Sequence, residues 1–471
     1  MSTEGSGRTG PKSGYCTDAV AACAQSAPDG TTVRLAGRIV LWRRMGGLIF
    51  GHVQDRSGRV QISLSKDELG ADVFKEWSRA VKIGDFVGVA GSLYTTRRGE
   101  RTVAVSEFTV LNRTVRALPD KWLGLSNVEA RYRRRYLDLL VNADSRERFQ
   151  TRSKIIQSIR RFLDDNDFLE VETPILQEAA SGAAARPFVT RHNALGEDFY
   201  LRISPETFLK RVVAGSLDRV YELGRNFRNE GMDSSHLQEF TMLEWYAAYW
   251  DYRDNMAFVR KLILAVLDEV LGTRTVTYDG VKLDFGTDWP ELDYRTEVAR
   301  RTGIDLTVVR DLSTLRERVT GLGLDVEEAM SYAGLVDLLY KKTVRPELIQ
   351  PCFLVHHPAE LVPLARRSDA DPTRLDMFQV VANGWEIVKA YSELVDSIEQ
   401  RLRLEEQAEL CEAGDGEAMM MEEDFIEAMA YGMPPMSGLG LGIDRFVALL
   451  TDAPTLREVV LFPAMRGTRK S

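Results

Sequence analysis

The sequence is poor in cysteine, and this scarcity limits the kinds of site and compartment that suit it. Its 471 residues include only four cysteines, namely Cys16, Cys23, Cys352 and Cys411. Their scattered spacing matches neither the paired ligands of a zinc site nor the framework of a disulfide-stabilised domain. We therefore expect a protein of the reducing cytosol.

Long apolar runs are absent as well. No stretch approaches the roughly 20 consecutive apolar residues of a membrane-spanning helix, so we expect no membrane partner. The letters AVAAC, which end at Cys23, resemble a lipoprotein cleavage box, but Asp18 interrupts the short apolar stretch around them. We therefore predict a cytoplasmic location rather than an export signal.

The chain also lacks an excess of positive charge. Its formal net charge of -9 argues against a protein that coats nucleic acid indiscriminately. Six arginines nevertheless stand between positions 34 and 59 against a single acid, Asp55, and four more stand between 131 and 135. Two such patches favour a polyanion bound in a defined place, although solvated arginines on strand and helix surfaces would give the same pattern.

Short runs of alternating apolar and polar residues begin at Thr31 and end near Leu111. Glycine-containing turns separate five such runs, and one helical stretch, ADVFKEWSRAV, lies among them. This pattern predicts a small closed β-barrel of the oligonucleotide-binding (OB) type over residues 31–118. Residues 1–30 are rich in small residues and lack periodicity, which predicts a disordered tail.

The rest of the chain alternates helices and strands without the regular rhythm of a parallel sheet. Residues 119–145 predict a linker that enters a helix. Short connections over residues 146–471 favour an antiparallel sheet flanked by helices. Within this region, residues from about 272 to 350 are polar and helical in pattern, which predicts an insertion. The predicted fold class is α+β.

One hairpin raises a specific question. The Asn383-Gly384 pair stands between two apolar runs, which predicts two strands joined by a tight two-residue turn. The second strand carries Glu386, Lys389 and Glu393 within a run apolar enough for a covered sheet. Charged groups at such positions need partners.

The densest group of ionisable residues lies between Gly224 and Tyr246. This group consists of Arg225, Arg228, Glu230, His236, Glu239 and Glu244. Arginine beside glutamate on a strand indicates a buried ion pair or an anion site. Taken alone, each residue also fits a structural role: Arg228 in an ion pair, His236 in a loop and Phe240 in the core.

Three segments in order resemble the motifs of the class II aminoacyl-tRNA synthetases. The segment from Gly224 to Tyr246 resembles motif two, with the residues typical of the lysine enzymes. The segment FLEVETPIL resembles motif one, and GLGLGIDRFVALL resembles motif three. From about Thr31 to Arg466 the chain is similar to the lysyl-tRNA synthetase family. The resemblance implies an OB-fold anticodon-binding domain, a class II catalytic domain, ATP as substrate, Mg²⁺ as cofactor and, through motif one, a homodimer.

The resemblance also implies roles in adenylate formation, a reaction that needs positioning and charge stabilisation rather than a covalent enzyme intermediate. Arg228 would hold the α-phosphate and the substrate carboxylate. Phe240 and Arg445 would enclose the adenine. The implied catalytic residues are Arg228, Glu230, Lys389 and Arg445. The implied ATP-binding residues are Arg228, Glu230, His236, Phe240, Glu386 and Arg445.

For the amino acid, the resemblance implies recognition of both ends of lysine. Glu206 and the backbone near Gly182 match positions that take the α-amino group, and Glu393 matches the position that takes the ε-ammonium. The implied lysine-binding residues are Gly182, Glu206, Arg228, Glu244, Tyr246, Tyr391, Glu393 and Gly440. Electrostatics agrees, because an ammonium in a low-dielectric pocket needs a fixed carboxylate. An aspartate or asparagine enzyme would need cationic or neutral donors there.

In the barrel, the resemblance implies anticodon contacts by Arg43, Phe50, Gln61 and Glu100. Phe50 would stack on a base, and the polar groups would contact base edges. In a generic barrel, Phe50 would instead belong to the core.

Two positions depart from the family pattern. Lysine enzymes usually carry glutamate at Gln379, where it holds Mg²⁺ together with the residue that matches Glu386, and asparagine at Lys389, where it holds the substrate carboxylate. We expect Gln379 to pair with Val388 and to lie beside Glu386, in a weakened metal site with fewer ions than usual. Strand alternation would place Lys389 on the other face unless a bulge intervenes.

Three interpretations of Lys389 are therefore open. Lys389 substitutes for a metal beside Glu386, or it holds the substrate carboxylate, or it pairs with Glu393 inside the amino-acid pocket. The first two preserve activity, whereas the third would damage it.

We predict a ligase that activates L-lysine as lysyl-adenylate and transfers it to the 3′ end of tRNA(Lys). One alternative is a relative that lysylates a protein, but the known kind lacks the barrel. The other is a catalytically altered paralogue that binds RNA. Intact Arg228, Glu230, Glu393 and Arg445 disfavour this paralogue, whereas Gln379 and Lys389 keep it open.

Overall fold

The chain consists of two compact units, Met1–Ser126 and Asn127–Ser471. The computed structural model describes residues 27–118, 125, 127–231, 233, 236–328, 330–412 and 418–467. Most of the predicted disordered tail, residues 1–30, lies outside the described residues. No helix in the described ranges combines the length and the apolar character that a membrane crossing requires.

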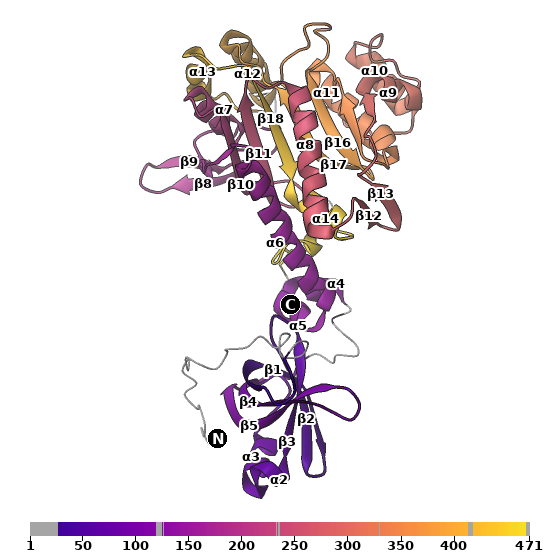
Figure 1. Ribbon diagram of the computed structural model, residues 1–471. Helices are drawn as coiled ribbons and strands as arrows, with labels where there is room; N and C mark the ends of the chain where they lie inside the picture. Colours follow the sequence, from indigo (N-terminus) through magenta and orange to yellow (C-terminus); the bar gives the residue numbers. More distant parts are fainter. Residues whose placement is uncertain are drawn as a thin grey trace. The chain divides into compact units, whose positions relative to one another are not determined.

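The first unit is a closed barrel of five strands in the order β1-β2-β3-β5-β4 (Figure 1). These strands are β1 (Thr32–Met45), β2 (Leu48–Gln54), β3 (Arg59–Ser65), β4 (Phe86–Thr95) and β5 (Arg101–Asn112). β3 and β5 pair in parallel, whereas their other neighbours are antiparallel. Helices α2 (Lys66–Leu69) and α3 (Ala71–Ala80) lie between β3 and β4. The predicted OB-fold is confirmed, including its helical stretch.

The second unit is built on an eight-stranded sheet in the order β14-β15-β16-β17-β18-β11-β10-β6. Its strands are β6 (Leu169–Glu170), β10 (Arg219–Phe227), β11 (Glu239–Ala248), β14 (Glu291–Asp293), β15 (Cys352–Val355), β16 (Met377–Ala382), β17 (Trp385–Ser392) and β18 (Met436–Gly442). Only the two edge pairs, β6 with β10 and β14 with β15, are parallel. This sheet is the predicted antiparallel one, and the α+β fold class is confirmed.

Helices cover both faces of this sheet (Figure 1). On one face, α6 (Ala143–Asp164), α8 (Tyr252–Val266) and α14 (Ile443–Leu450) enclose the largest apolar core. Along β11, Leu243 and Trp245 point into this core. Their neighbour Tyr246 points to the opposite face, where α7 (Glu206–Ala214) packs on β10 and β11. The alternation of β11 thus separates a core face from a second face that carries polar groups.

The connection to the second unit differs from the predicted linker helix over residues 119–145. Two short helices, α4 (Val128–Arg133) and α5 (Arg135–Val141), begin the second unit itself. Their arginines are not a free basic patch. Arg135 is fully buried and pairs with Asp138 at 2.6 Å, and Arg131 pairs with Glu458 at 3.1 Å. Arg133 pairs with Glu129 at 2.7 Å, so acidic partners neutralise three of the four arginines and leave Arg134 exposed.

The segment from about 272 to 350 is only partly helical. It begins with the hairpin β12 (Thr275–Tyr278) and β13 (Val281–Asp284), and β14 then joins the edge of the main sheet. Its helices are α9 (Tyr294–Thr302), α10 (Leu312–Gly321), α11 (Tyr332–Leu339), η2 (Tyr340–Val344) and η3 (Arg345–Glu347). The prediction of a helical insertion is therefore corrected, because three short strands, β12, β13 and β14, were not recognised in the polar sequence.

The remaining elements border the sheet. A small sheet has the strand order β7-β9-β8. These elements are β7 (Leu176–Gln177), β8 (Phe188–His192), β9 (Glu197–Leu201), η1 (Leu267–Leu271), η4 (Ala359–Leu361), α12 (Ser397–Glu412), α13 (Glu423–Ala430) and η5 (Leu456–Glu458).

Candidate active site and nucleic-acid-binding face

A cavity of about 290 Å³ opens on the polar face of the sheet, opposite α8. Met242, Glu244 and Tyr246 of β11 line it, as do residues of β17, of β18 and of the first turn of α14. The cavity gathers most of the predicted catalytic, lysine-binding and ATP-binding residues: Gly182, Glu206, Arg228, Glu230, His236, Phe240, Glu244, Tyr246, Glu386, Lys389, Tyr391, Gly440 and Arg445. Residues of motifs two and three and of the β16–β17 hairpin therefore meet at one place.

The β16–β17 hairpin has the predicted tight turn but not the predicted register. Asn383 and Gly384 have φ values of 48° and 70°, which the turn requires. Gln379 pairs with Lys389 rather than with Val388, because β17 carries one extra residue, Ile387, between the Val381–Glu386 and Val380–Val388 pairs. This β-bulge lets Glu386 and Lys389 line the same cavity.

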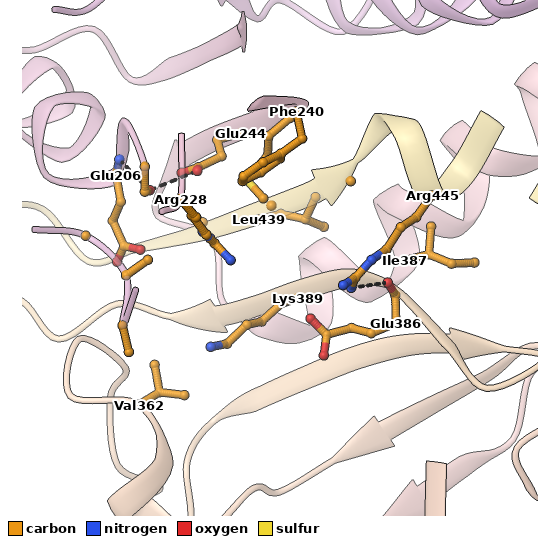
Figure 2. Close-up of a pocket in the computed structure, with 18 of the residues that line it drawn as sticks. Glu206, Arg228, Phe240, Glu244, Val362, Glu386, Ile387, Lys389, Leu439 and Arg445 are labelled. Carbon is orange, nitrogen blue, oxygen red and sulfur yellow. Dashed lines mark hydrogen bonds between the residues drawn. The ribbon is translucent and has the colours of Figure 1, made fainter. Parts of the chain in front are cut away.

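One half of the cavity is cationic. Figure 2 shows the side chains of Arg228, Lys389 and Arg445 directed into a shared space. The Arg228 guanidinium lies 5.1 Å from the centre of the Phe240 ring. Burial lowers the pKa of Arg228, and the nearby Arg445 lowers it further. Arg445, at the start of α14, donates to the Glu386 backbone oxygen at 3.1 Å. Three cations around one space indicate an anion site.

The loop between β10 and β11 contributes the next two predicted residues. Glu230 and His236 both border the cavity. The ring Nδ1 of His236 lies 2.8 Å from a carboxylate oxygen of Asp233. Glu230 raises the pKa of Arg228 against the effect of burial. These two residues therefore lie at the mouth of the cationic half.

The other half of the cavity is acidic. Glu206 and Glu244 line it, whereas the predicted Glu393 is not among the lining residues and is joined to Glu206 through Lys210. Glu206, Glu244 and Glu393 are at most 6% exposed. Lys210, on the first turns of α7, is fully buried between two of them, with its Nζ 2.7 Å from Glu206 and 2.5 Å from Glu393. The Tyr391 hydroxyl donates to Glu206 at 2.7 Å. If all three carboxylates are ionised, the Lys210 ammonium balances one of their charges, and Arg228 acts on Glu244 from the cationic half.

The titration of these carboxylates reflects that imbalance. Burial, together with the neighbouring Glu206, raises the pKa of Glu244 to about 8. Burial also raises the pKa of Glu393 to about 8, although the adjacent Lys210 opposes this effect. Burial alone would lower the pKa of Lys210, but the two carboxylates outweigh it and raise that pKa. The empty pocket thus favours protonated glutamates until a cation enters.

Two glycines have different roles around this pocket. A side chain at Gly438 would collide with the Tyr246 ring and the Glu393 carboxylate. At Gly440, a Cβ atom would meet no protein atom closer than 3.7 Å. Packing within the protein therefore requires glycine at 438. No such packing constraint applies at Gly440, one of the residues that the resemblance implies for lysine binding.

Glu386 differs from the acidic group in its surroundings. Burial would raise its pKa, but Arg445, Lys389 and two further cations outweigh burial and hold the pKa below its ordinary value. Its carboxylate accepts a hydrogen bond from the Gln379 amide nitrogen at 2.8 Å. The Tyr340 hydroxyl donates to the amide oxygen of Gln379 at 3.0 Å. Glu386 is therefore held as a carboxylate by donors and cations.

This arrangement does not fit the Mg²⁺ pair that the resemblance implies. A metal ligand must offer a lone pair, but Gln379 directs its NH₂ group at Glu386 and its oxygen at Tyr340. Gln379 is also absent from the residues that line the cavity. Within the described residues, no group of three or more histidine, cysteine or acidic side chains is arranged to hold a metal.

Sequence reasoning missed several residues that organise the site. Lys210 was one, although its spacing of four residues from Glu206 on a helix could have indicated an ion pair. Another is Arg152 on α6, which pairs with Asp444 at 2.6 Å. Asp444 in turn accepts from the Thr241 backbone at 2.8 Å. These contacts join α6, β11 and α14, and no local pattern in the sequence predicts them.

In the first unit, the predicted anticodon residues share the outer face of the barrel. Ile49 and Val53 of β2 belong to the barrel core, whereas Phe50 between them points outward and is partly exposed. Phe50 pairs with Arg43 of β1 on one side and with Ser63 of β3 on the other. The core interpretation of Phe50 is therefore wrong.

A second row of polar residues runs beside Phe50. His52 is paired in register with Gln61. The His52 ring lies 2.9 Å from a carboxylate oxygen of Glu100, and Gln61 donates to the Thr102 hydroxyl at 2.8 Å. An aromatic ring beside polar groups on an outer barrel face is typical of a surface that binds single-stranded nucleic acid.

The fold and the cavity together define a class II aminoacyl-tRNA synthetase, and comparison with protein families agrees. Residues 127–466 match the family described as tRNA synthetases class II (D, K and N), and residues 33–111 match the OB-fold nucleic acid binding domain. The chain therefore belongs to the class II tRNA synthetases of this aspartate, lysine and asparagine group.

Within that group, its curated relatives are lysine–tRNA ligases. The enzyme of Chloroflexus aurantiacus is 46% identical over 450 residues, which cover 95% of this chain and 92% of the relative. The enzyme of Bacillus subtilis is 44% identical over 434 residues, which cover 92% and 87%. The enzyme of Aquifex aeolicus is 45% identical over 444 residues, which cover 94% and 74%.

Proposed function

We propose that this chain activates L-lysine with ATP and transfers it to tRNA(Lys). The observation that carries this choice within the family is the charge of the buried half of the cavity. When ionised, Glu206, Glu244 and Glu393 carry three negative charges, of which the buried Lys210 balances one. Lysine brings two ammonium groups. Aspartate and asparagine bring only one, and their side chains would face carboxylates at a cost of several kcal/mol.

Each end of lysine has a plausible partner. Glu206 and the backbone near Gly182 would receive the α-ammonium, and Glu393 with Tyr246 would receive the ε-ammonium. Glu244 stands between them and accepts from the Ser204 hydroxyl at 2.9 Å. The substrate carboxylate would then point toward Arg228, at the border of the cationic half.

The cationic half would bind ATP. A carboxylate oxygen of lysine attacks the α-phosphorus, and Arg228 would stabilise the negative charge that develops there. Phe240 and Arg445 would enclose the adenine, with Glu230 and His236 at the mouth of the cavity. A planar guanidinium and an aromatic ring both suit a flat base.

The barrel would select the tRNA. Phe50 would stack on an anticodon base, while Arg43, Gln61 and Glu100 would contact base edges or phosphates. We further propose a cytoplasmic homodimer, since motif one resembles the dimer-forming segment of the family. Mg²⁺ would accompany ATP. The chain's own pair, Gln379 and Glu386, does not offer the ligands that a protein-held ion requires.

The protein-lysylating relative and the RNA-binding paralogue are the competing functions. The barrel opposes the first, because the known kind lacks it. The intact cavity opposes the second, because an RNA-binding protein has no need for the buried carboxylates of Glu206, Glu244 and Glu393.

ATP–pyrophosphate exchange with lysine, aspartate or asparagine tests the proposal, followed by charging of purified tRNA. We expect exchange with lysine alone, and lysylation of tRNA(Lys). Exchange with aspartate or asparagine would contradict the choice of amino acid. Exchange with lysine that leaves tRNA uncharged would point to the protein-lysylating relative.

A further inference from the structure

Lys389 stands where it can reach the reacting atoms. The bulge at Ile387 turns Lys389 toward the cavity that Glu386 also lines. In Figure 2, the Lys389 and Arg228 side chains enter the same space from opposite sides, Lys389 from β17 and Arg228 from the end of β10. A group bound in this space would therefore face both charged ends.

The amino-acid pocket does not need Lys389. Glu393 already has a cation, since Lys210 lies 2.5 Å from it. Within the part of the chain that the structure describes, Lys389 makes no salt bridge with any carboxylate. The interpretation in which Lys389 pairs with Glu393 and blocks the pocket is therefore not supported. Lys389 lowers the pKa of Glu386, but because it forms no salt bridge its ammonium is available for an anionic ligand.

The Gln379–Glu386 contact determines what else could supply positive charge here. A carboxylate only accepts hydrogen bonds, so the Gln379 amide must present its nitrogen to Glu386, 2.8 Å away. The amide oxygen is occupied by the Tyr340 hydroxyl at 3.0 Å. A second acceptor beside Glu386, which a bridging divalent ion would require, is therefore missing from this contact.

We propose that Lys389 is a catalytic residue that contacts the α-phosphate and the substrate carboxylate, and that its ammonium takes the place of a protein-held Mg²⁺. The inference rests on the proposed activation of lysine. In that step a carboxylate oxygen forms a bond to the α-phosphorus. The bond from phosphorus to the bridging oxygen breaks, and pyrophosphate leaves with its electron pair. No proton moves, so fixed cations on both sides, Arg228 and Lys389, serve the reaction directly.

Lys389→Met tests the role of the charge, because methionine nearly preserves the length of the side chain and removes the ammonium. We expect lysine-dependent exchange to fall ~10²- to 10³-fold with little change in the melting temperature. Lys389→Arg, which keeps a cation, should retain more activity than Lys389→Met. The matched control is Lys282→Met, on an exposed position of β13 outside the cavity. Equal activity of Lys389→Met and the parent would overturn the proposal.

A second experiment counts metal ions rather than turnover. Mn²⁺ is titrated into the enzyme with lysine and the α,β-methylene analogue of ATP, and bound Mn²⁺ is measured by electron paramagnetic resonance. The double variant Gln379→Glu/Lys389→Asn should bind about one Mn²⁺ more per active site than the parent, since it restores a second carboxylate. Equal numbers in the two proteins would overturn the substitution of metal by lysine.

The two proposals fail in different ways. If the parent enzyme shows no lysine-dependent exchange, the proposed function itself is wrong. If the parent exchanges with lysine while Lys389→Met is fully active, only the role of Lys389 is wrong.

Discussion

The two halves of the cavity use the same kind of residue in opposite ways. Glu244 and Glu386 are both glutamates that line it, yet burial beside Glu206 raises the pKa of Glu244 to about 8, whereas Arg445 and Lys389 overcome burial and lower the pKa of Glu386. The surrounding charges, rather than the residue type, decide which carboxylate lacks a cation. In the proposed function, the uncompensated half would select the amino acid and the compensated half would bind the nucleotide.

The separation of acidic and cationic side chains follows from the elements that carry them. Glu206 and Lys210 come from α7, whose first residue lies beside the cavity, and Glu393 follows β17 directly. Arg445 comes from α14 at the other end of β18. Carboxylates therefore predominate at one end of the cavity and cations at the other, as the proposed pair of ligands, lysine and ATP, would require.

The largest effect is expected from removing Arg228, the cation at the border between the acidic and cationic halves of the cavity. Arg228→Ala should lower lysine-dependent pyrophosphate exchange ~10²- to 10³-fold, because it removes a preorganised charge from the developing transition state. The melting temperature should stay near that of the parent. Arg318→Ala, on the exposed surface of α10, is the control. Near-normal exchange by folded Arg228→Ala would show that the cationic half has been assigned wrongly.

On the acidic side, Glu393→Gln should weaken lysine binding and leave ATP binding nearly unchanged. The loss should be about 1.5 to 3 kcal/mol, as for a hydrogen bond to a charged group, or roughly 10- to 150-fold in the dissociation constant. Calorimetry with each ligand measures both effects, and Glu406→Gln on the exposed side of α12 serves as the control. Equal losses for lysine and ATP would make Glu393 a structural residue.

A substitution in the barrel should affect tRNA binding without affecting either half of the cavity. Phe50→Ala should raise the Michaelis constant for tRNA by an amount equivalent to ~1 to 3 kcal/mol, the value of one stacked base. Exchange of pyrophosphate, which needs no tRNA, should be unchanged. Phe86→Ala, at another exposed position of the barrel, is the control. Unaltered charging of tRNA by Phe50→Ala would remove this residue from the anticodon-binding face.

The sequence predicts the parts of this architecture that depend on local patterns. Alternating runs with glycine turns indicate the barrel, and Asn383-Gly384 indicates the hairpin, because these signals act over a few residues. The β-bulge at Ile387 is different. Whether β17 gains a residue depends on its packing between β16 and β18, so simple alternation assigned Lys389 to the wrong face.

Partners that are distant in the sequence could not be predicted either, because their contacts also depend on tertiary packing. The cluster at 131–135 looked like a binding patch, but one of its acidic partners, Glu458, is more than 300 residues away. Lys210 could have been paired with Glu206 from helix spacing, whereas its contact with Glu393 requires the folded sheet. Residue types thus identified the site, and tertiary structure decided which charges stay unbalanced.

The unbalanced charge can be measured by titrating lysine and norleucine, which lacks the ε-ammonium, into the parent enzyme by calorimetry. At pH 7, Glu244 and Glu393, with pKa values raised to about 8, are largely protonated in the empty pocket. Entry of two ammonium groups should ionise them, so lysine binding should release about one to two protons, seen as a dependence of the heat on the buffer. Norleucine should bind more weakly and release fewer protons. Equal affinity for the two amino acids, with no proton release, would contradict a pocket built for two positive charges.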